Sequence, residues 1–277
     1  MKVQAISDLH ADYTENREWI KALSQTQFVD DVLILAGDIS DDFALLKEML
    51  TTLRERFSRL LFVAGNHDVW VRSGDFDCSL EKHAAIYALC AELGIDTKRF
   101  TFQGVDFVPL QSWYDFSFGQ PDSNLLRAWR DFHACQWPQH LADSQAVAEH
   151  FLASNESALN AEKVGEVLIS CSHFLPSLAL MPGWIPESRR RVYPVLGSDA
   201  LGEQVRRLQS DIHLYGHSHV NQTLKLGATY FVNNAFATPK ERRIAGKQLR
   251  CIFDSEEKPL ARVEGLAQAA REGAFWS

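Results

Sequence analysis

Short runs of apolar residues recur along the chain, and each is followed at once by glycine or by polar residues. Five of these runs have the length of a buried strand and end where Asp, Asn or His residues begin. They cover residues 3–6, 31–36, 60–64, 167–171 and 212–215. The pattern predicts strands whose ends carry side chains suited to bind metal or to take part in catalysis.

Apolar residues also recur at helical spacing, which predicts amphipathic helices between or after the first strands. Asp41 and Asp42 are suited to cap the second of these helices, and Gly94 is suited to end the third. The alternation of strands and helices predicts βαβ units and therefore an α/β fold. The three helical segments are residues 16–25, 43–56 and 80–93.

The rest of the chain departs from this alternation. Residues 100–113 predict two short antiparallel strands that meet near Gly104. Residues 115–160 are rich in aromatic side chains, and we expect them to form helices and loops that wall a pocket. Two closing strands and two further helices are expected at residues 230–232, 249–253, 199–208 and 260–271. We find no internal repeat, linker or low-complexity segment, so we expect one domain over residues 1–277.

Composition narrows the possible functions. The chain is 46% hydrophobic and 23% charged, which is ordinary for a globular protein. Its formal net charge of −8 argues against a general nucleic-acid binder, which needs a basic face to neutralise phosphates. An anionic substrate stays possible because bound divalent cations would reverse the local charge in a pocket lined with carboxylates.

Cysteine usage and the N-terminal sequence bear on location. The five cysteines are scattered and form no CxxC pair, which favours a reduced, cytoplasmic setting. The chain begins with a predicted strand rather than a signal peptide, and no apolar run approaches the roughly 20 residues of a membrane span. We therefore expect a cytoplasmic protein that does not bind membranes.

The polar residues at the strand ends form a set of candidate metal ligands. Asp and His residues two positions apart leave extended backbone on the same side and can converge on one ion. The set contains two carboxylates, one amide and four imidazoles, too many donors for one ion and about right for two that share a bridge. The candidate ligands are Asp8, His10, Asp38, Asn66, His173, His217 and His219. Asp38 is the natural bridge because it stands alone between two pairs of ligands.

Two further residues are candidates for catalysis. His67 follows a ligand and titrates near neutral pH, and Asp68 could orient its imidazole. Residues Arg189 to Arg191 predict a solvated surface patch, with contact to a substrate phosphate as the alternative. The remaining histidines lack ligand spacing and are expected to be structural or exposed: His83, His133, His140, His150 and His213.

The ordered motifs resemble the five-block signature of the calcineurin-like metallophosphoesterase superfamily. The blocks are Asp8-Leu9-His10, Gly37-Asp38, Gly65-Asn66-His67-Asp68, Ser172-His173 and Gly216-His217-Ser218-His219. The resemblance implies a four-layered α/β/β/α sandwich with a dinuclear metal site at the carboxyl ends of the strands. By position, one metal ion would be held by Asp8, His10, Asp38 and His219. The other would be held by Asp38, Asn66, His173 and His217.

The resemblance also implies a reaction. A metal-bridging hydroxide would attack a phosphate mono- or diester, and His67, which matches the family's catalytic histidine, would protonate the leaving group. Asp68 matches the acidic residue that follows it. Mixed nitrogen and oxygen sites accept Mn, Fe, Zn, Ni or Co, and we favour Mn or Fe.

Several alternatives remain open from the sequence. On the same scaffold they include a cyclic-nucleotide phosphodiesterase, a pyrophosphatase, a protein phosphatase and a nuclease. A non-catalytic metal-binding scaffold protein is a further alternative, although such proteins typically have a broken ligand set and this one is complete. We expect a small or nucleotide-like phosphate ester as substrate and no stable binding of nucleic acid.

Overall fold

A computed structural model describes residues 1–72 and 74–271, and it contains two β-sheets. The strands of the first sheet are β1 (Lys2–Ile6), β2 (Val32–Ala36), β3 (Arg59–Val63) and β10 (Arg250–Asp254). Their order is β10-β1-β2-β3, and β1, β2 and β3 run parallel. The parallel strands confirm the predicted βαβ units, and β10 closes the sheet in the antiparallel direction.

The second sheet is larger and mixed. Its strands are β4 (Phe100–Phe102), β5 (Val105–Pro109), β6 (Val167–Cys171), β7 (Ile212–Tyr215), β8 (Gln222–Leu226) and β9 (Thr229–Asn233). Their order is β4-β5-β6-β7-β9-β8, in which β5, β6, β7 and β9 are parallel. The antiparallel pairing of β4 with β5 confirms the predicted hairpin.

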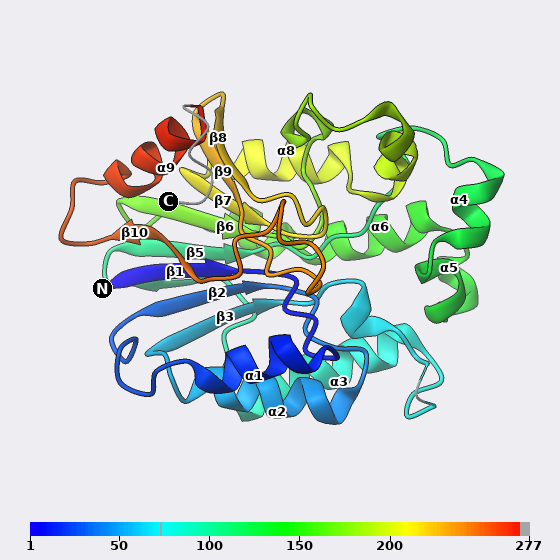
Figure 1. Cartoon of the computed structure of the whole chain (residues 1–277), viewed down its shortest axis with the longest axis horizontal. Coiled ribbons are helices and arrows are strands. Elements are labelled where there is room, and N and C mark those ends of the chain that lie inside the picture. The colour runs from blue at the N-terminus through cyan, green and yellow to red at the C-terminus, as the bar shows by residue number, and fades with distance from the viewer. Residues whose placement is uncertain (73, 272–277) are drawn as a thin grey trace.

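Helices cover the outer face of each sheet, so the two sheets lie face to face in the middle of the molecule (Figure 1). Helices α1 (Thr14–Ala22), α2 (Phe43–Arg54) and α3 (Ser79–Glu92) cover the first sheet. The second sheet is covered by α6 (Ser144–Ser154) and α8 (Asp199–Leu208), whereas α9 (Ala261–Arg271) packs against the edge strands β8 and β10 and joins the core between the sheets. This arrangement confirms the predicted four-layered α/β/β/α sandwich.

Shorter helices lie in the connections. The α-helical ones are α4 (Ser123–Ala128), α5 (Asp131–Ala134) and α7 (Glu156–Asn160). The 3₁₀ segments are η1 (His67–Val69), η2 (Gln139–Leu141), η3 (Leu178–Leu180) and η4 (Glu187–Val195). Helices and loops were expected between residues 115 and 160, where α4 to α7 are found.

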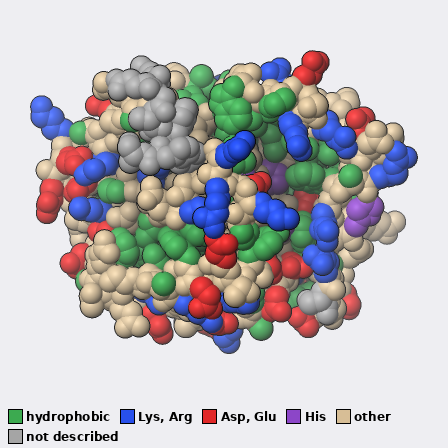
Figure 2. Space-filling model, in the orientation of Figure 1, with side chains coloured by type: hydrophobic (Ala, Val, Ile, Leu, Met, Phe, Trp, Pro, Cys, Tyr) green, Lys and Arg blue, Asp and Glu red, His purple; other side chains and the backbone are tan. Residues whose placement is uncertain are grey.

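Alternation along the strands divides the core into layers. In β2, Val32, Ile34 and Ala36 pack between the two sheets, whereas Leu33 and Leu35 pack against the helices of the first sheet. Successive side chains of a strand point to opposite faces, so a strand covered on both sides must be apolar throughout. This is why the strands read as continuous apolar runs, while charged side chains gather on the outside (Figure 2).

The predicted helix ends are also found. Asp42 caps α2 through the backbone N–H of Leu45, and Ser198 caps α8. Gly94 follows the C-cap of α3 with a φ of +66°, a backbone conformation that glycine adopts without strain. These caps fix where each helix begins or ends and therefore where the connecting loops start.

Two expectations differ from the structure. Strand β8 was not predicted, because it is a partly exposed edge strand without an apolar run. Trp113, Tyr114 and Phe151 pack into the core beneath α6 and α8, where Trp113 and Phe151 border a cavity of only about 10 Å³. Trp129 is the aromatic residue of that segment whose ring approaches the strand ends, with its centroid 5.9 Å from that of His217.

Two further observations concern the membrane and the thiols. Among residues 1–72 and 74–271, no helix has both the length and the apolar character needed to cross a membrane. The five cysteines are all free, in line with their scattered spacing.

Candidate metal centre

The loops that follow β1, β2, β3, β6 and β7 meet at the carboxyl ends of these strands and bring the candidate ligands together. Three overlapping groups have ligand atoms within 4.8 Å of one another. The groups are Asp8, His10 and His219; His10, Asp38 and His67; and Asp38, His173 and His217. Side chains separated by more than 200 positions in the sequence therefore share one site.

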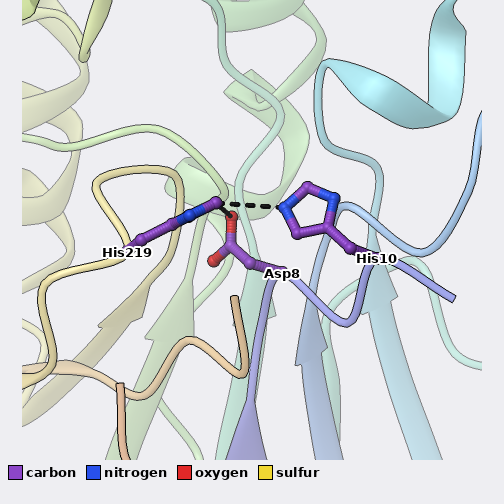
Figure 3. A group of neighbouring side chains, drawn as sticks. All are labelled: Asp8, His10 and His219. Atoms are coloured by element: carbon purple, nitrogen blue, oxygen red, sulfur yellow. Dashed lines mark hydrogen bonds and ion pairs between the residues drawn. The ribbon is translucent and has the colours of Figure 1, made fainter. Parts of the chain in front are cut away.

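The first group joins the loop after β1 to the loop after β7 (Figure 3). The Nε2 atoms of His10 and His219 are 3.0 Å apart. The Nε2 atom of His219 also lies 3.2 Å from Asp8 Oδ1. Figure 3 shows the three side chains pointing toward one another, which leaves their donor atoms around one common point.

A second set of donor atoms, from Asn66, His217 and Asp38, surrounds the Nε2 atom of His173. This atom lies 3.0 Å from Asn66 Oδ1, 3.2 Å from His217 Nδ1 and 3.5 Å from Asp38 Oδ2. Asp38 Oδ2 also lies 4.0 Å from His10 Nε2 in the first group. Asp38 is thus the carboxylate between the two groups, the position that a bridging ligand requires.

Outward hydrogen bonds identify the ring nitrogens that face the site. His173 Nδ1 donates to the carbonyl of Ala36 at 2.8 Å, and His217 Nε2 donates to the carbonyl of Val195 at 3.0 Å. A carbonyl oxygen accepts but never donates, so these nitrogens carry the protons. The opposite nitrogens then present lone pairs to the site. Such outward bonds are typical of histidines that ligate metals.

Two acidic residues missed in the sequence orient ligands in the same way. Asp131 accepts from Asn66 Nδ2 at 2.8 Å, which turns the amide oxygen of Asn66 toward His173. Glu241 lies 2.9 Å from His219 Nδ1 and is itself held by the backbone N–H and hydroxyl of Thr238. Asp131 begins the short helix α5 and Glu241 lies in a loop, and neither belongs to a recognisable local pattern, so no sequence signal pointed to them.

Asp131 also connects the site to the aromatic segment. Its carboxylate accepts from Trp70 Nε1 and Trp129 Nε1, both at 2.7 Å. Trp70 in turn stacks on the imidazole of His67, with ring centroids 3.7 Å apart. One buried carboxylate therefore positions a ligand and two indole rings that border the site.

The predicted partner of His67 has a different set of contacts. The Asp68 carboxylate accepts from the backbone N–H groups of Asp38, Ile39, Ser40 and Gly65, at distances of 2.7 to 3.2 Å. Among the described residues it forms no hydrogen bond or ion pair with the His67 imidazole. We infer that Asp68 positions the loop that carries Asp38 against the turn that carries Asn66.

His67 itself lies at the open edge of the site. Its side chain is 28% exposed, whereas those of His10 and His173 are 3% and 1% exposed. Its backbone N–H donates to Asp38 Oδ1 at 2.9 Å, and its Nε2 lies 3.8 Å from Asp38 Oδ2. The imidazole is therefore accessible from outside while its backbone is fixed to the central carboxylate.

The backbone around the ligands is strained. Five of the seven candidate ligands have a positive φ, between 42° and 64°: Asp8, His10, Asp38, His217 and His219. This region is uncommon for residues other than glycine and costs on the order of 1–3 kcal/mol per residue. Hydrogen bonds between the loops offset this strain, including Asp8 N–H to Gly37 and His10 N–H to Asp38. Strain of this kind is concentrated at functional sites.

Close packing explains two glycines of the predicted motifs. A Cβ atom at Gly65 would lie 2.2 Å from Asp38 Oδ1, and one at Gly37 would lie 2.5 Å from His173 Nδ1. Gly37 also has a φ of +83°. These positions leave no room for any other residue without displacing a ligand.

The electrostatics of the site favour added positive charge. Burial and the neighbouring carboxylates of Asp8 and Asp68 raise the pKa of Asp38 well above its ordinary value. Burial alone would lower the pKa of His219, but Asp8 and Glu241 outweigh it and raise this pKa to about 10. Converging lone pairs and crowded carboxylates are the donor set that a divalent cation fits.

The other histidines lie where the sequence predicted. His83 is within 3.3 Å of Gln111 and stacks on Tyr87. His213 is buried between the hydroxyls of Ser170 and Ser172. His133, His140 and His150 belong to none of the three groups of candidate ligands among the described residues.

A comparison with protein families agrees with this geometry. The family model for calcineurin-like phosphoesterases matches residues 1–221. The chain belongs to this family. Membership supports phosphoester hydrolysis as the activity, and members of the family use divalent metal ions.

One curated relative has a described activity. The chain is 30% identical over 123 residues to the [acyl-carrier-protein] phosphodiesterase PptH of Mycobacterium tuberculosis. That match covers 41% of this chain and 38% of the relative's length. The crystal structure of this phosphopantetheinyl hydrolase superposes with a TM-score of 0.78 at 21% identity, covering 93% of this chain and 98% of that one. The structural likeness shows that the fold is shared.

Replacing Glu241 with Gln should weaken metal binding at the group formed by Asp8, His10 and His219. Glutamine keeps the size of the side chain but removes the charge that holds the His219 imidazole. We expect an affinity for Mn²⁺ roughly 10–100-fold lower at one of two sites, measured by calorimetric titration of the metal-depleted protein. Glu256→Gln, on an exposed turn, is the matched control and should bind Mn²⁺ like the native protein. Equal affinities in both variants would exclude this role for Glu241.

Proposed function

We propose that the chain hydrolyses a phosphodiester at a pair of divalent metal ions, with Mn or Fe favoured. One ion would be held by Asp8, His10, Asp38 and His219. The other would be held by Asp38, Asn66, His173 and His217. The observation that carries the proposal is the position of the Asp38 carboxylate between two groups of converging nitrogen and oxygen donors.

Bound divalent ions would lower the pKa of a coordinated water and offset charge on the phosphoryl oxygens. Asp38 would hold the two groups of ligands at a fixed separation, and Asn66, oriented by Asp131, would complete the second group. His67 is proposed as the general acid because its side chain is accessible and it is not one of the seven proposed ligands. Its imidazole would protonate the oxygen of the leaving group as the bond between that oxygen and phosphorus breaks. The bond between the water oxygen and phosphorus would form in the same step.

We propose a protein-bound phosphopantetheine as the substrate. The similarity to PptH, whose name describes a phosphodiesterase acting on acyl carrier protein, supports this choice. The sequence favoured a small or nucleotide-like phosphate ester, and a phosphopantetheinyl arm presents the same phosphodiester chemistry on a larger carrier. The single domain over residues 1–277 and the cytoplasmic setting remain predictions.

The experiment compares three substrates in the presence of Mn²⁺: bis(p-nitrophenyl) phosphate, p-nitrophenyl phosphate and phosphopantetheinylated acyl carrier protein. We expect the diester to be hydrolysed faster than the monoester and the carrier protein to release phosphopantetheine. Chelation of metal with EDTA should abolish all turnover, and added Mn²⁺ should restore it. Absence of hydrolysis with Mn²⁺, Fe²⁺ and Zn²⁺ would refute the proposed function.

His67→Ala should separate metal binding from proton transfer. A diester with an alkyl leaving group needs the proton most, so its turnover should fall by about 10²–10⁴. Hydrolysis of bis(p-nitrophenyl) phosphate should fall less, because p-nitrophenolate leaves without protonation, and Mn²⁺ stoichiometry should stay the same. His140→Ala, at an exposed position, is the control. An equal loss on both substrates would remove His67 from the proton-transfer step.

A further inference from the structure

Five exposed basic side chains near the metal centre form no hydrogen bond or ion pair with any described residue. They are Arg130, Arg189, Arg191, Lys240 and Arg243. We call these residues the basic rim. Figure 2 shows Lys and Arg side chains standing around a hollow in the middle of one face, in which a His side chain is visible.

Each part of the basic rim is tied to a ligand of the metal centre. Arg130 precedes Asp131, which accepts a hydrogen bond from Asn66. Arg189 and Arg191 lie in η4, whose last residue accepts from His217 through its carbonyl at 3.0 Å. Lys240 and Arg243 flank Glu241, which lies 2.9 Å from His219. The segments that carry the basic rim therefore also carry groups that contact three different ligands of the metal centre.

Exposed apolar side chains accompany this charge. Trp184 is 58% exposed and Leu126 is 43% exposed, in the segments that carry Arg189 and Arg130. The guanidinium group of Arg190 donates to the carbonyls of Gly183 and Ile185, on either side of Trp184, at 3.1 and 3.0 Å. These bonds fix the loop that presents the indole. Arg and Trp side chains in this combination are typical of the energetic centres of protein interfaces.

The charge of the whole chain argues for a compact acidic partner. With 28 basic and 36 acidic residues, the protein is net negative, so the basic rim is a local positive surface on a chain of opposite overall charge. An extended polyanion such as nucleic acid would meet repulsion beyond that surface. A folded protein with one acidic face would give the unpaired guanidinium groups carboxylate partners and place its apolar side chains on Trp184.

We propose that the basic rim, with Trp184 and Leu126, is the docking surface for an acidic protein that carries the scissile phosphodiester. This proposal rests on the proposed function, because it names the partner of the same site. Docking there would place the arm of the carrier over the metal centre. It would also make the reaction with a carrier faster than the reaction with a small diester of equal reactivity.

The test uses an acidic acyl carrier protein that bears phosphopantetheine, and it measures binding by fluorescence anisotropy separately from turnover. We expect binding to weaken about tenfold when NaCl is raised from 50 to 300 mM, and again about tenfold in Arg189→Glu/Arg191→Glu. In the same double variant, the ratio of kcat/KM for the carrier to kcat/KM for bis(p-nitrophenyl) phosphate should fall about tenfold. Trp184→Ala should weaken binding without changing the salt dependence.

The control is Lys258→Glu, which reverses one exposed charge in the connection from β10 to α9. That connection lies beside the amino end of β1, opposite the metal centre (Figure 1). Binding and turnover should match those of the native protein. Binding that is insensitive to salt and to the double variant would overturn the docking proposal even if the diester is hydrolysed. Equal displacement of the carrier by single-stranded DNA would also overturn it. Salt-sensitive binding without any hydrolysis would refute the proposed function and leave docking supported.

Discussion

The carboxylate of Asp38 sits in a fully buried position between two groups of imidazoles, and the rest of the site is arranged around it. Burial disfavours its negative charge, and the carboxylates of Asp8 and Asp68 add repulsion. The Nε2 atoms of His10 and His219 face each other at only 3.0 Å. Such crowding is unfavourable unless positive charge stands among the donors. Divalent cations would supply that charge, which connects the electrostatics of the folded chain with the use of metal by its family.

Rigid loops make this crowded arrangement possible. Backbone strain at Asp8 and Asp38 persists only because neighbouring elements hold the loops in place. Asp68 fastens two of the loops through backbone N–H groups, and Asp131 and Glu241 fix the orientation of individual ligands. The parallel strands beneath bring all of these loops to the same edge of the two sheets. The free energy gained by apolar burial in the four-layered sandwich thus offsets the cost of bringing these polar side chains together.

Much of this organisation was predictable from the sequence. Strands buried on both faces appear as continuous apolar runs, so their ends, and with them Asp38 and His173, could be located directly. Asp131 and Glu241 could not, because each is a single acidic residue whose role depends on a contact distant in sequence. The contacts of Asp68 could not be predicted either, because its carboxylate accepts hydrogen bonds from the backbone of a loop about 30 residues earlier in the chain. Edge strand β8 lacked the apolar run that identified its neighbours.

The most direct test of the account is the number and position of metal ions in a crystal of the protein grown with Mn²⁺. Anomalous diffraction at the manganese edge should show two peaks, one on each side of the Asp38 carboxylate. One peak should be bounded by His10 and His219, and the other by Asn66, His173 and His217. A single peak at saturating Mn²⁺, or two peaks that do not share Asp38, would contradict the account.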